Sequence, residues 1–369
     1  MKYFYQHPDW SQFYWDRRHI DRLVQESVYL QGKLNGKISG LDKASRQIRE
    51  GQTLTEEVLS NFGIENQKLD PEQVRSSVIR KMNPAAKPRK PNRLEDAAVD
   101  ILWDAVKSAS KPLTRKRLFD WHRKLFDPRL SPHHIVTDQW RTGRKGPMQI
   151  VSGRIGRETV HYEAPPTSDV PRQMELFFAW INGEGASGGP LYAAIAHLWF
   201  VSIHPFKDGN GRLARAITEM LLARTDTASG KYYSMSGQIL PRRKQYYDIL
   251  EQTQKGNLDI TGWLEWFLDT LKAAILASDR QIDLAIRKQR FWQTYGRDIT
   301  NPRQRKIIEM LLDDNFRGHL TTSKWAKINK CSPDTALRDI KELLARNILV
   351  KAEKGGRSTH YLFNSELEF

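Results

Sequence analysis

Apolar residues recur at helical spacing along most of the chain. Ile20, Leu23, Val24, Val28 and Leu30 follow one another at intervals near the helical period, and charged residues fill the gaps. About the first ninety residues are therefore predicted to be helical. The same spacing predicts further helices over residues 94–106, 118–125, 173–181, 191–202, 211–224 and 263–288. The pattern is that of a mainly α-helical protein.

Two segments break the helical pattern with β-rich runs. Residues 148–151 and 159–162 flank a glycine-bearing turn and are predicted to form a hairpin. Near the C-terminus, amphipathic helices over 304–312, 322–328 and 333–346, the last capped by Ser332, precede strands over 348–353 and 359–363. Helix-turn-helix followed by a hairpin is a winged-helix pattern.

Domain boundaries follow from breaks in these patterns. Residues 83–92 contain three prolines and three cations, which forbid a regular helix. We therefore predict a helical extension over 1–92, a core over 93–299 and a winged helix-turn-helix over 300–369.

Composition narrows the class of protein. The chain has 369 residues, 39% of them hydrophobic, and one cysteine, Cys331. A single cysteine excludes an internal disulfide and a cysteine-based zinc site, so a disulfide-stapled secreted domain is ruled out. The start lacks the pattern of a signal peptide, and the longest apolar run, 191–203, is too short to cross a bilayer. We expect a cytoplasmic protein with no membrane partner.

The charge of the chain calls for an anionic partner. There are 59 Lys and Arg against 43 Asp and Glu, a net charge of +16. Nucleic acid and a phosphorylated ligand both fit such a surplus. Residues 300–369 hold 13 Lys and Arg against 9 Asp and Glu, so most of the surplus lies in the first 299 residues.

One glycine pattern is a decoy. Residues 183–188 match G-x-G-x-x-G, the dinucleotide-binding fingerprint. That fingerprint must follow a strand, whereas residues 174–181 have the pattern of a helix. We interpret the segment as a loop between helices.

The segment 204–215, with the sequence HPFKDGNGRLAR, gathers the residue types of a phosphate site. Pro205, Gly209 and Gly211 predict a loop and a new helix starting near Gly211. The first N–H groups of a helix are unpaired and its dipole is positive there, so Gly209 and Gly211, with Asn210 between them, form an anion cradle.

The side chains around the cradle add chemistry to it. Arg212 and Arg215 share one helix face and can grip phosphate oxygens. Asp208 supplies the oxygen ligand that Mg²⁺ prefers beside phosphates, and His204 has a pKa suited to taking a proton near neutral pH. Alone, the histidine could be structural, the glycines a turn, and Arg215 a partner of Glu219. Their combination at this spacing favours the phosphate site.

This segment resembles the signature of the Fic (filamentation induced by cAMP) family, His-x-Phe-x-(Asp/Glu)-Gly-Asn-Gly-Arg-x-x-Arg, at every defined position. The resemblance implies an all-helical core with a β-hairpin flap that aligns a target peptide. It also implies AMPylation, the transfer of AMP from ATP to a Ser, Thr or Tyr hydroxyl of a protein, the chain itself included, with release of pyrophosphate.

The resemblance also assigns roles to single residues. His204 would deprotonate the target hydroxyl, Asp208 would hold Mg²⁺, and Phe206 would anchor the loop. The phosphates of ATP would be held by Gly209, Asn210, Gly211, Arg212 and Arg215. The flap residues would be Ile150, Val151, Val160, His161 and Tyr162. Gly211, in place of a bulkier residue, favours adenylyl over phosphate transfer. Tyr247 and Gln254 fall where relatives contact adenosine, although a Tyr246-Tyr247 pair also fits packing.

Many Fic proteins carry an inhibitory helix, (Ser/Thr)-x-x-x-Glu-(Gly/Asn), whose Glu blocks the γ-phosphate position. Residues 61–66 resemble it at Glu65 and Asn66, whereas Asn61 replaces the Ser or Thr. The resemblance implies autoinhibition through an ion pair between Glu65 and Arg215, with a solvated surface glutamate as the alternative.

Other functions stay open at this stage. In relatives the same glutamate can position water for removing AMP, so the chain could be a de-AMPylase that uses Glu65. The winged helix, with Arg338 and Lys341 on its third helix, could contact DNA or protein, which makes a nucleotide-sensing DNA-binding regulator a further reading. A homodimer is compatible with the sequence.

Overall fold

The computed structural model describes residues 2–83, 85, 93–127, 135–143, 146–154, 157–226, 230–312, 316, 318–352, 359–364 and 366–367. The chain forms two compact units, Met1–Asp279 and Arg280–Phe369. Most of the predicted proline-rich connector, 83–92, lies outside the described residues.

The larger unit is mostly helical. Its helices are α1 (Arg17–Ser39), α2 (Lys43–Ile64), α3 (Pro71–Met82), α4 (Leu94–Lys107), α5 (Arg115–Leu125), α6 (Val170–Asn182), α7 (Pro190–Ile203), α8 (Asn210–Ala223), α9 (Met235–Ile239), α10 (Arg243–Gln254) and the first part of α11 (Thr261–Tyr295). Short 3₁₀ helices cover Phe4–Gln6, Thr167–Asp169, Glu184–Ser187 and Leu240–Arg242. The helices predicted from residue spacing are confirmed.

Local sequence starts several of these helices. The side chains of Asp16, Asp42 and Asp70 accept backbone N–H groups in the first turns of α1, α2 and α3, and Thr114 does the same for α5. Proline stands in the first turn of α3, α6 and α7, where its missing N–H costs nothing.

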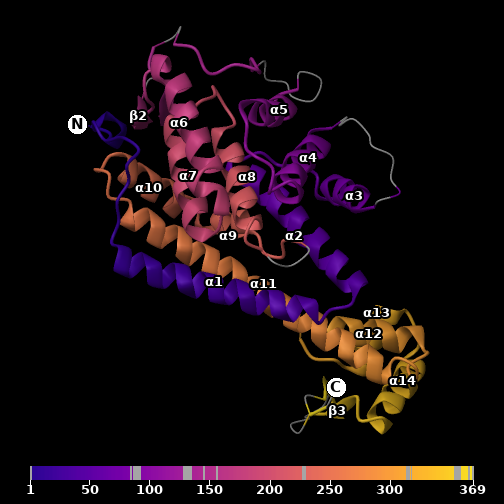
Figure 1. The fold of residues 1–369 in the computed structure, drawn as a ribbon. Coiled ribbons are helices and arrows are strands. Elements are labelled where there is room, and N and C mark those ends of the chain that lie inside the picture. Colours follow the sequence, from indigo (N-terminus) through magenta and orange to yellow (C-terminus); the bar gives the residue numbers. More distant parts are fainter. Residues whose placement is uncertain are drawn as a thin grey trace. The chain divides into compact units, whose positions relative to one another are not determined.

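Helix α7 is the centre of the larger unit (Figure 1). From Ala193 to Ile203 every residue is buried, which matches the uniformly apolar sequence of this helix. Helix α8 packs along α7, and α2 and α4 pack against α8. The segment between α7 and α8 is therefore held from several sides.

The predicted hairpin is formed by strands β1 (Gln149–Arg154) and β2 (Arg157–Glu163). They pair antiparallel, with an irregular register between Ile150 and Val151. Its inner face is covered by the N-terminal segment: the rings of Tyr3 and Tyr162 meet edge to face at 5.2 Å. The N-terminal residues thus buttress the hairpin.

The smaller unit has the predicted order of elements. Helices α12 (Pro302–Leu312), α13 (Thr322–Asn329) and α14 (Pro333–Ala345) precede the antiparallel strands β3 (Leu349–Lys351) and β4 (Tyr361–Phe363). Ser332 caps α14 through the backbone N–H of Thr335. A core that includes Trp325 and Ile340 fills the unit. Residues 353–358, between its two strands, lie outside the described residues.

Two further expectations can be compared with the structure. The segment 183–188 follows helix α6, not a strand, so the dinucleotide fingerprint is excluded as expected; the connection to α7 contains the 3₁₀ helix Glu184–Ser187. None of the helices within the described residues is both long and apolar enough to span a bilayer.

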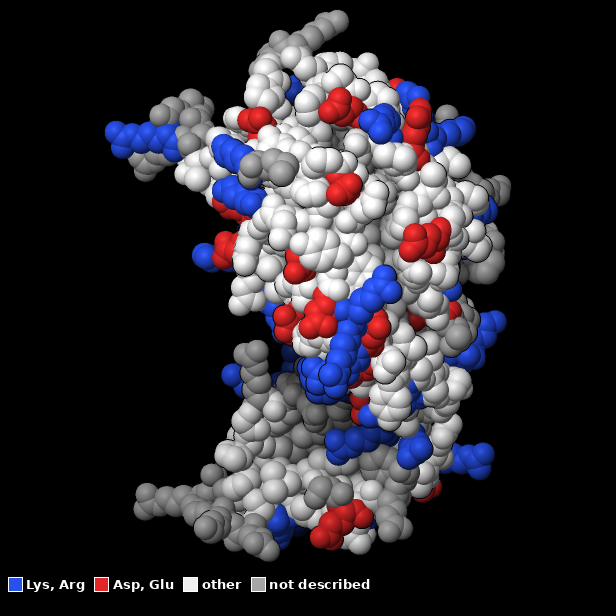
Figure 2. Space-filling model, turned by 60° about the vertical axis from the view of Figure 1, so that its left-hand side comes forward, with Lys and Arg blue, Asp and Glu red and all other residues white. Residues whose placement is uncertain are grey.

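On the face shown in Figure 2, cationic and anionic side chains are interspersed.

Candidate active site

His204 stands immediately after α7 in a left-handed conformation, with φ of 51°. Its Nδ1 lies 3.2 Å from the carbonyl oxygen of Val201. A carbonyl can only accept, so this contact assigns the ring proton to Nδ1 and leaves the lone pair on Nε2. Burial lowers the pKa of His204 to about 4, which keeps the imidazole neutral near pH 7. The side chain is thus in the form that can accept a proton.

The loop after His204 is closed by Asn210. Its side chain accepts a hydrogen bond from the Phe206 N–H at 3.0 Å and donates one to the Phe206 carbonyl at 2.8 Å. Phe206 is buried and stacks on His122, with ring centroids 4.0 Å apart. The Asn210 amide is therefore engaged within the loop, whose shape it fixes.

Two glycines, Gly209 and Gly211, flank the first residue of α8. Gly209 has φ of 84°, and a Cβ there would meet Leu125 and Phe126 at 2.8 Å, so only glycine fits without displacement. Asp208, whose side chain is 51% exposed, accepts from the Gly209 N–H at 2.5 Å and from Arg212 Nη2 at 3.3 Å. An exposed carboxylate thus borders a helix N-terminus.

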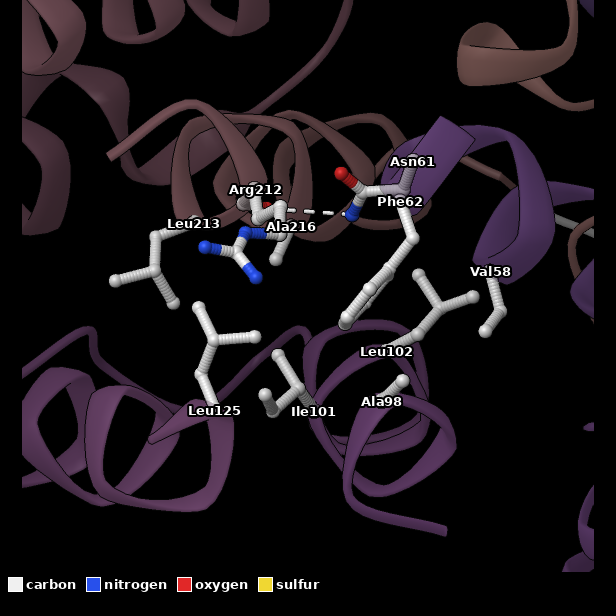
Figure 3. A pocket seen from close by; sticks show the side chains of 10 residues that line it. All are labelled: Val58, Asn61, Phe62, Ala98, Ile101, Leu102, Leu125, Arg212, Leu213 and Ala216. Carbon is white, nitrogen blue, oxygen red and sulfur yellow. Dashed lines mark hydrogen bonds between the residues drawn. The ribbon is translucent and has the colours of Figure 1, made fainter. Parts of the chain in front are cut away.

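Arg212 and Arg215 both lie on the buried side of α8. Figure 3 shows the guanidinium of Arg212 directed into a small pocket lined by apolar side chains of α2, α4, α5 and α8. It lies between the rings of Phe62 and Phe126, at 5.4 and 5.2 Å from their centroids. Among the described residues, Arg212 Nε and Arg215 Nη1 are buried donors without a hydrogen-bond acceptor.

Helix α2 supplies the partners of Arg215. Its Nε donates to Asn61 Oδ1 at 2.6 Å, and its Nη2 donates to the Asn61 carbonyl at 3.0 Å and to Glu65 Oε1 at 2.8 Å. Asn61 Nδ2 also donates to the Arg212 carbonyl at 3.3 Å, the bond drawn in Figure 3. Asn61, the residue that departs from the inhibitory pattern, thus makes three contacts with α8.

Glu65 stands over the start of α8. A Cβ placed on Gly211 would clash with its carboxylate and lie 3.2 Å from Arg215 Nη1. Burial opposes the charge of Glu65, but the adjacent Arg215 outweighs it and lowers the pKa of the carboxyl. Tyr247, 37% exposed, donates to Glu65 Oε2 at 3.3 Å. The carboxylate therefore lies against the first turn of α8 and is held there by Arg215 and Tyr247.

The remaining sequence-predicted residues lie in two places. Gln254 is buried and donates to Ser202 Oγ at 2.9 Å, so its amide faces the core. On the hairpin, Val151 is exposed, Ile150 and Val160 are half-buried, and His161 contacts both Ser152 and Glu251 at 2.5 Å. Tyr162 is buried and donates to the Ser202 carbonyl at 2.8 Å.

Two residues at the site were missed by the sequence analysis. Gln67 accepts from Arg212 Nη1 at 2.7 Å, so both arginines are held by the segment around Glu65. Arg141 donates from Nε to the His204 carbonyl at 2.7 Å. Neither belongs to a motif; Gln67 lies two positions beyond Glu65, the one signal that could have suggested it.

Comparisons with protein families match two separate parts of the chain. Residues 112–222 match the Fic/DOC family, and residues 3–83 match a domain of unknown function (DUF4172). The first match contains the loop of His204 and both arginines. The second contains Asn61 and Glu65.

Individual relatives agree with the first match. The chain is 29% identical over 192 residues to a protein adenylyltransferase Fic of Drosophila virilis, covering 50% of this chain and 34% of that protein. It is 36% identical over 116 residues to the one of Drosophila melanogaster, covering 30% and 22%. The matched part thus spans about a third or less of these relatives.

Two solved structures share the fold. A Fic domain containing signaling protein from Bacteroides thetaiotaomicron superposes with a TM-score of 0.51 at 17% identity, over 70% of this chain and 95% of that one. A fragment of Fic-1 from C. elegans gives a TM-score of 0.51 at 19% identity, over 74% and 75%. These likenesses concern the fold.

Proposed function

We propose that the protein is an adenylyltransferase that moves AMP from ATP to a Ser, Thr or Tyr hydroxyl of a protein, because residues 112–222 match the Fic/DOC family. The observation that carries the proposal is the neutral imidazole of His204 beside a glycine-bordered helix N-terminus with two buried arginines. A base next to an anion site is what adenylyl transfer requires.

The residues present suit a triphosphate. Arg212 Nε and Arg215 Nη1 are buried donors that lack an acceptor within the described residues, and phosphate oxygens would supply it. The first N–H groups of α8, beside Gly209 and Gly211, lack intrahelical partners and can bind an anion. Tyr247, at the rim, suits contact with the adenosine.

Asp208 fits the role of a Mg²⁺ ligand. Mg²⁺ in nucleotide sites is held by one or two carboxylates together with phosphate oxygens and water. No cluster of three metal-binding side chains occurs within the described residues, so a metal here would be carried by the nucleotide and a single carboxylate. The ion would neutralise charge on the phosphates.

The reaction proceeds in one displacement. The hydroxyl oxygen of the target attacks the α-phosphorus of ATP while its proton passes to His204 Nε2. The bond from the α-phosphorus to the bridging oxygen breaks, and that oxygen leaves with pyrophosphate. The donors on α8 stabilise the charge that collects on the phosphates.

We further propose that Glu65 autoinhibits this reaction. Its carboxylate pairs with Arg215 and stands over Gly211, so a γ-phosphate and Glu65 compete for the same guanidinium. Asn61 and Gln67 hold the arginines alongside. ATP whose γ-phosphate contacts Arg215 can then bind only when the C-terminal end of α2 moves away.

The target segment is proposed to bind at the hairpin. Val151 and Val160 leave part of their side chains open to solvent, and Ile150, His161 and Tyr162 fix the hairpin to the core. A two-stranded sheet has open edges that can pair with an extended segment of another protein or of a second copy of this chain.

The test is incorporation of label from α-labelled ATP into protein by Glu65→Gly, with Glu65→Gly/His204→Ala as its control. The proposal predicts labelled protein with the first variant and about 10²- to 10⁴-fold less with the second, the usual contribution of a general base. Equal labelling by both would contradict the role of His204.

Two other functions are outcomes of matched tests. If Glu65 positions water for the reverse reaction, Glu65→Gly should lose AMP removal from a modified protein and gain no transfer. If the second unit is a winged helix that binds DNA, duplex affinity should fall with salt and with Arg338→Ala or Lys341→Ala. The single Cys331 fits a reducing, cytoplasmic setting.

A further inference from the structure

The end of α7 carries backbone carbonyls that no further turn of helix can satisfy. Side chains take over that role. The Tyr162 hydroxyl donates to the Ser202 carbonyl at 2.8 Å. Arg141 donates from Nε to the His204 carbonyl at 2.7 Å and from Nη2 to the Ile203 carbonyl at 3.5 Å. The backbone on which the imidazole of His204 stands is thus held by the hairpin and by the segment before it.

The same guanidinium also holds the exit of the hairpin. Arg141 lies before β1, and its Nη2 donates to the carbonyl of Pro165, just after β2, at 2.5 Å. Its Nη1 donates to Thr167 Oγ1 at 3.1 Å, and its own backbone N–H donates to the Pro205 carbonyl at 2.9 Å. One side chain therefore connects the segment that leaves the hairpin to the loop of His204.

The burial of Arg141 is costly. The side chain is 7% exposed, and its acceptors are neutral carbonyls and a hydroxyl. Burial lowers the pKa of its guanidinium, a sign that the surroundings disfavour the charge. A neutral residue could fill the space at lower cost, but only a planar group with five donors can reach this many acceptors at fixed angles.

We propose that Arg141 is a positioning residue that sets the distance between the hairpin and the imidazole of His204. It acts through the backbone, because it joins the end of α7 to the segment that leaves the hairpin after β2. A target hydroxyl presented by the hairpin then meets Nε2 of His204 at the right place. This inference rests on the proposed function and adds a residue that determines how fast transfer occurs.

The test uses Arg141→Lys and Arg141→Gln in the full chain with Glu65→Gly. Lysine keeps the charge but cannot span acceptors in four places. We expect transfer from α-labelled ATP to fall about 10- to 100-fold at saturating ATP, since small misplacements of reacting groups cost this much. Affinity for a fluorescent ATP analogue should stay unchanged, because the donors on α8 are untouched.

Arg224 provides a matched control. It too is a partly buried arginine that donates to carbonyls of separate segments, those of Ala109, Ile181 and Gly185, at 2.8 to 3.3 Å. It lies just after the other end of α8. Arg224→Lys should lower thermal stability as Arg141→Lys does and leave transfer per folded molecule unchanged. Similar transfer by the two lysine variants would overturn the proposal.

A gentler variant guards against misfolding. Tyr162→Phe removes only the hydroxyl bond to Ser202 and keeps the ring against Tyr3. We expect Tyr162→Phe to lose less transfer activity than Arg141→Lys. The double variant Tyr162→Phe/Arg141→Lys should lose less than the product of the two single losses, because both side chains hold the end of α7. Independent effects would contradict a shared role.

Amide hydrogen exchange reports on positioning without any transfer. Arg141→Lys should speed exchange in β1, β2 and the last turn of α7 but not in α4. Unchanged exchange at the hairpin would overturn the proposal even if transfer falls. If the Glu65→Gly parent shows no transfer, the proposed function fails, and the exchange measurement alone decides the role of Arg141.

Discussion

The contact between Glu65 and Arg215 gives the sharpest quantitative expectation. The pair is formed at 2.8 Å, with the arginine side chain 2% exposed and the carboxylate 32% exposed. A hydrogen bond to a charged group contributes about 1.5–3 kcal/mol. Since each 1.4 kcal/mol is a factor of about ten, the closed state is favoured about 10- to 100-fold by this contact. ATP that needs the open state loses affinity by the same factor.

The perturbations are Glu65→Gly and Glu65→Gln. Glycine removes the carboxylate, so we expect ATP to bind about 10- to 100-fold more tightly than to the wild type, as measured by titration calorimetry. Glutamine keeps an acceptor for Arg215 but no charge, and should fall between the two. Glu26→Gln, which disturbs a partly exposed ion pair with Lys272 on α11, is the control and should leave the affinity unchanged. Equal affinities for wild type and Glu65→Gly would refute the competition between carboxylate and phosphate.

Three further predictions concern Gly211, Asn61 and His197. Gly211→Ala places a Cβ 3.2 Å from Arg215 Nη1 at the start of α8. In the Glu65→Gly background this variant should bind a fluorescent ATP analogue more weakly, and unchanged binding would argue against an anion site there. Asn61→Ala removes the acceptor of the buried Arg215 Nε, so it should lower the free energy of unfolding in urea by about 1–3 kcal/mol. The same variant should bind ATP more tightly, and a higher free energy of unfolding would contradict the geometry. His197 is buried in α7, where its ring contacts Thr218 and Tyr246, and burial lowers its pKa from 6.5 to about 3. Because the unfolded chain takes up a proton there more readily, the neutral residue supports stability above pH 6.5 and this support is lost as the pH falls. The destabilisation by His197→Gln should therefore be about 2 kcal/mol smaller at pH 5 than at pH 7.5, and an equal value at both would show that the residue is not held neutral.

Local signals made much of the fold predictable. Helix α7 is a continuous apolar run, and α1, α2 and α3 begin at aspartates that cap them, so spacing and capping identify these helices. The loop before α8 was predictable because Gly209 and Gly211 have conformational and steric reasons to be glycine.

The contacts that complete the site depend on tertiary structure. Arg141 bonds to backbone carbonyls of residues up to 63 positions away, and any residue has a carbonyl, so the sequence gives no pattern to find. The burial of Gln254 depends on where α10 meets Ser202. The reach of Asn61 to Arg215 likewise depends on how closely α2 approaches α8, and the residue type alone does not fix that.

Adenylyl transfer is tested most directly by comparing two positions of label in ATP. Glu65→Gly is incubated with α-labelled and with γ-labelled ATP, each beside Glu65→Gly/His204→Ala. We predict label on protein from the α position alone, lost with His204, and equimolar release of pyrophosphate. Label from the γ position, or α label that persists without His204, would contradict the account.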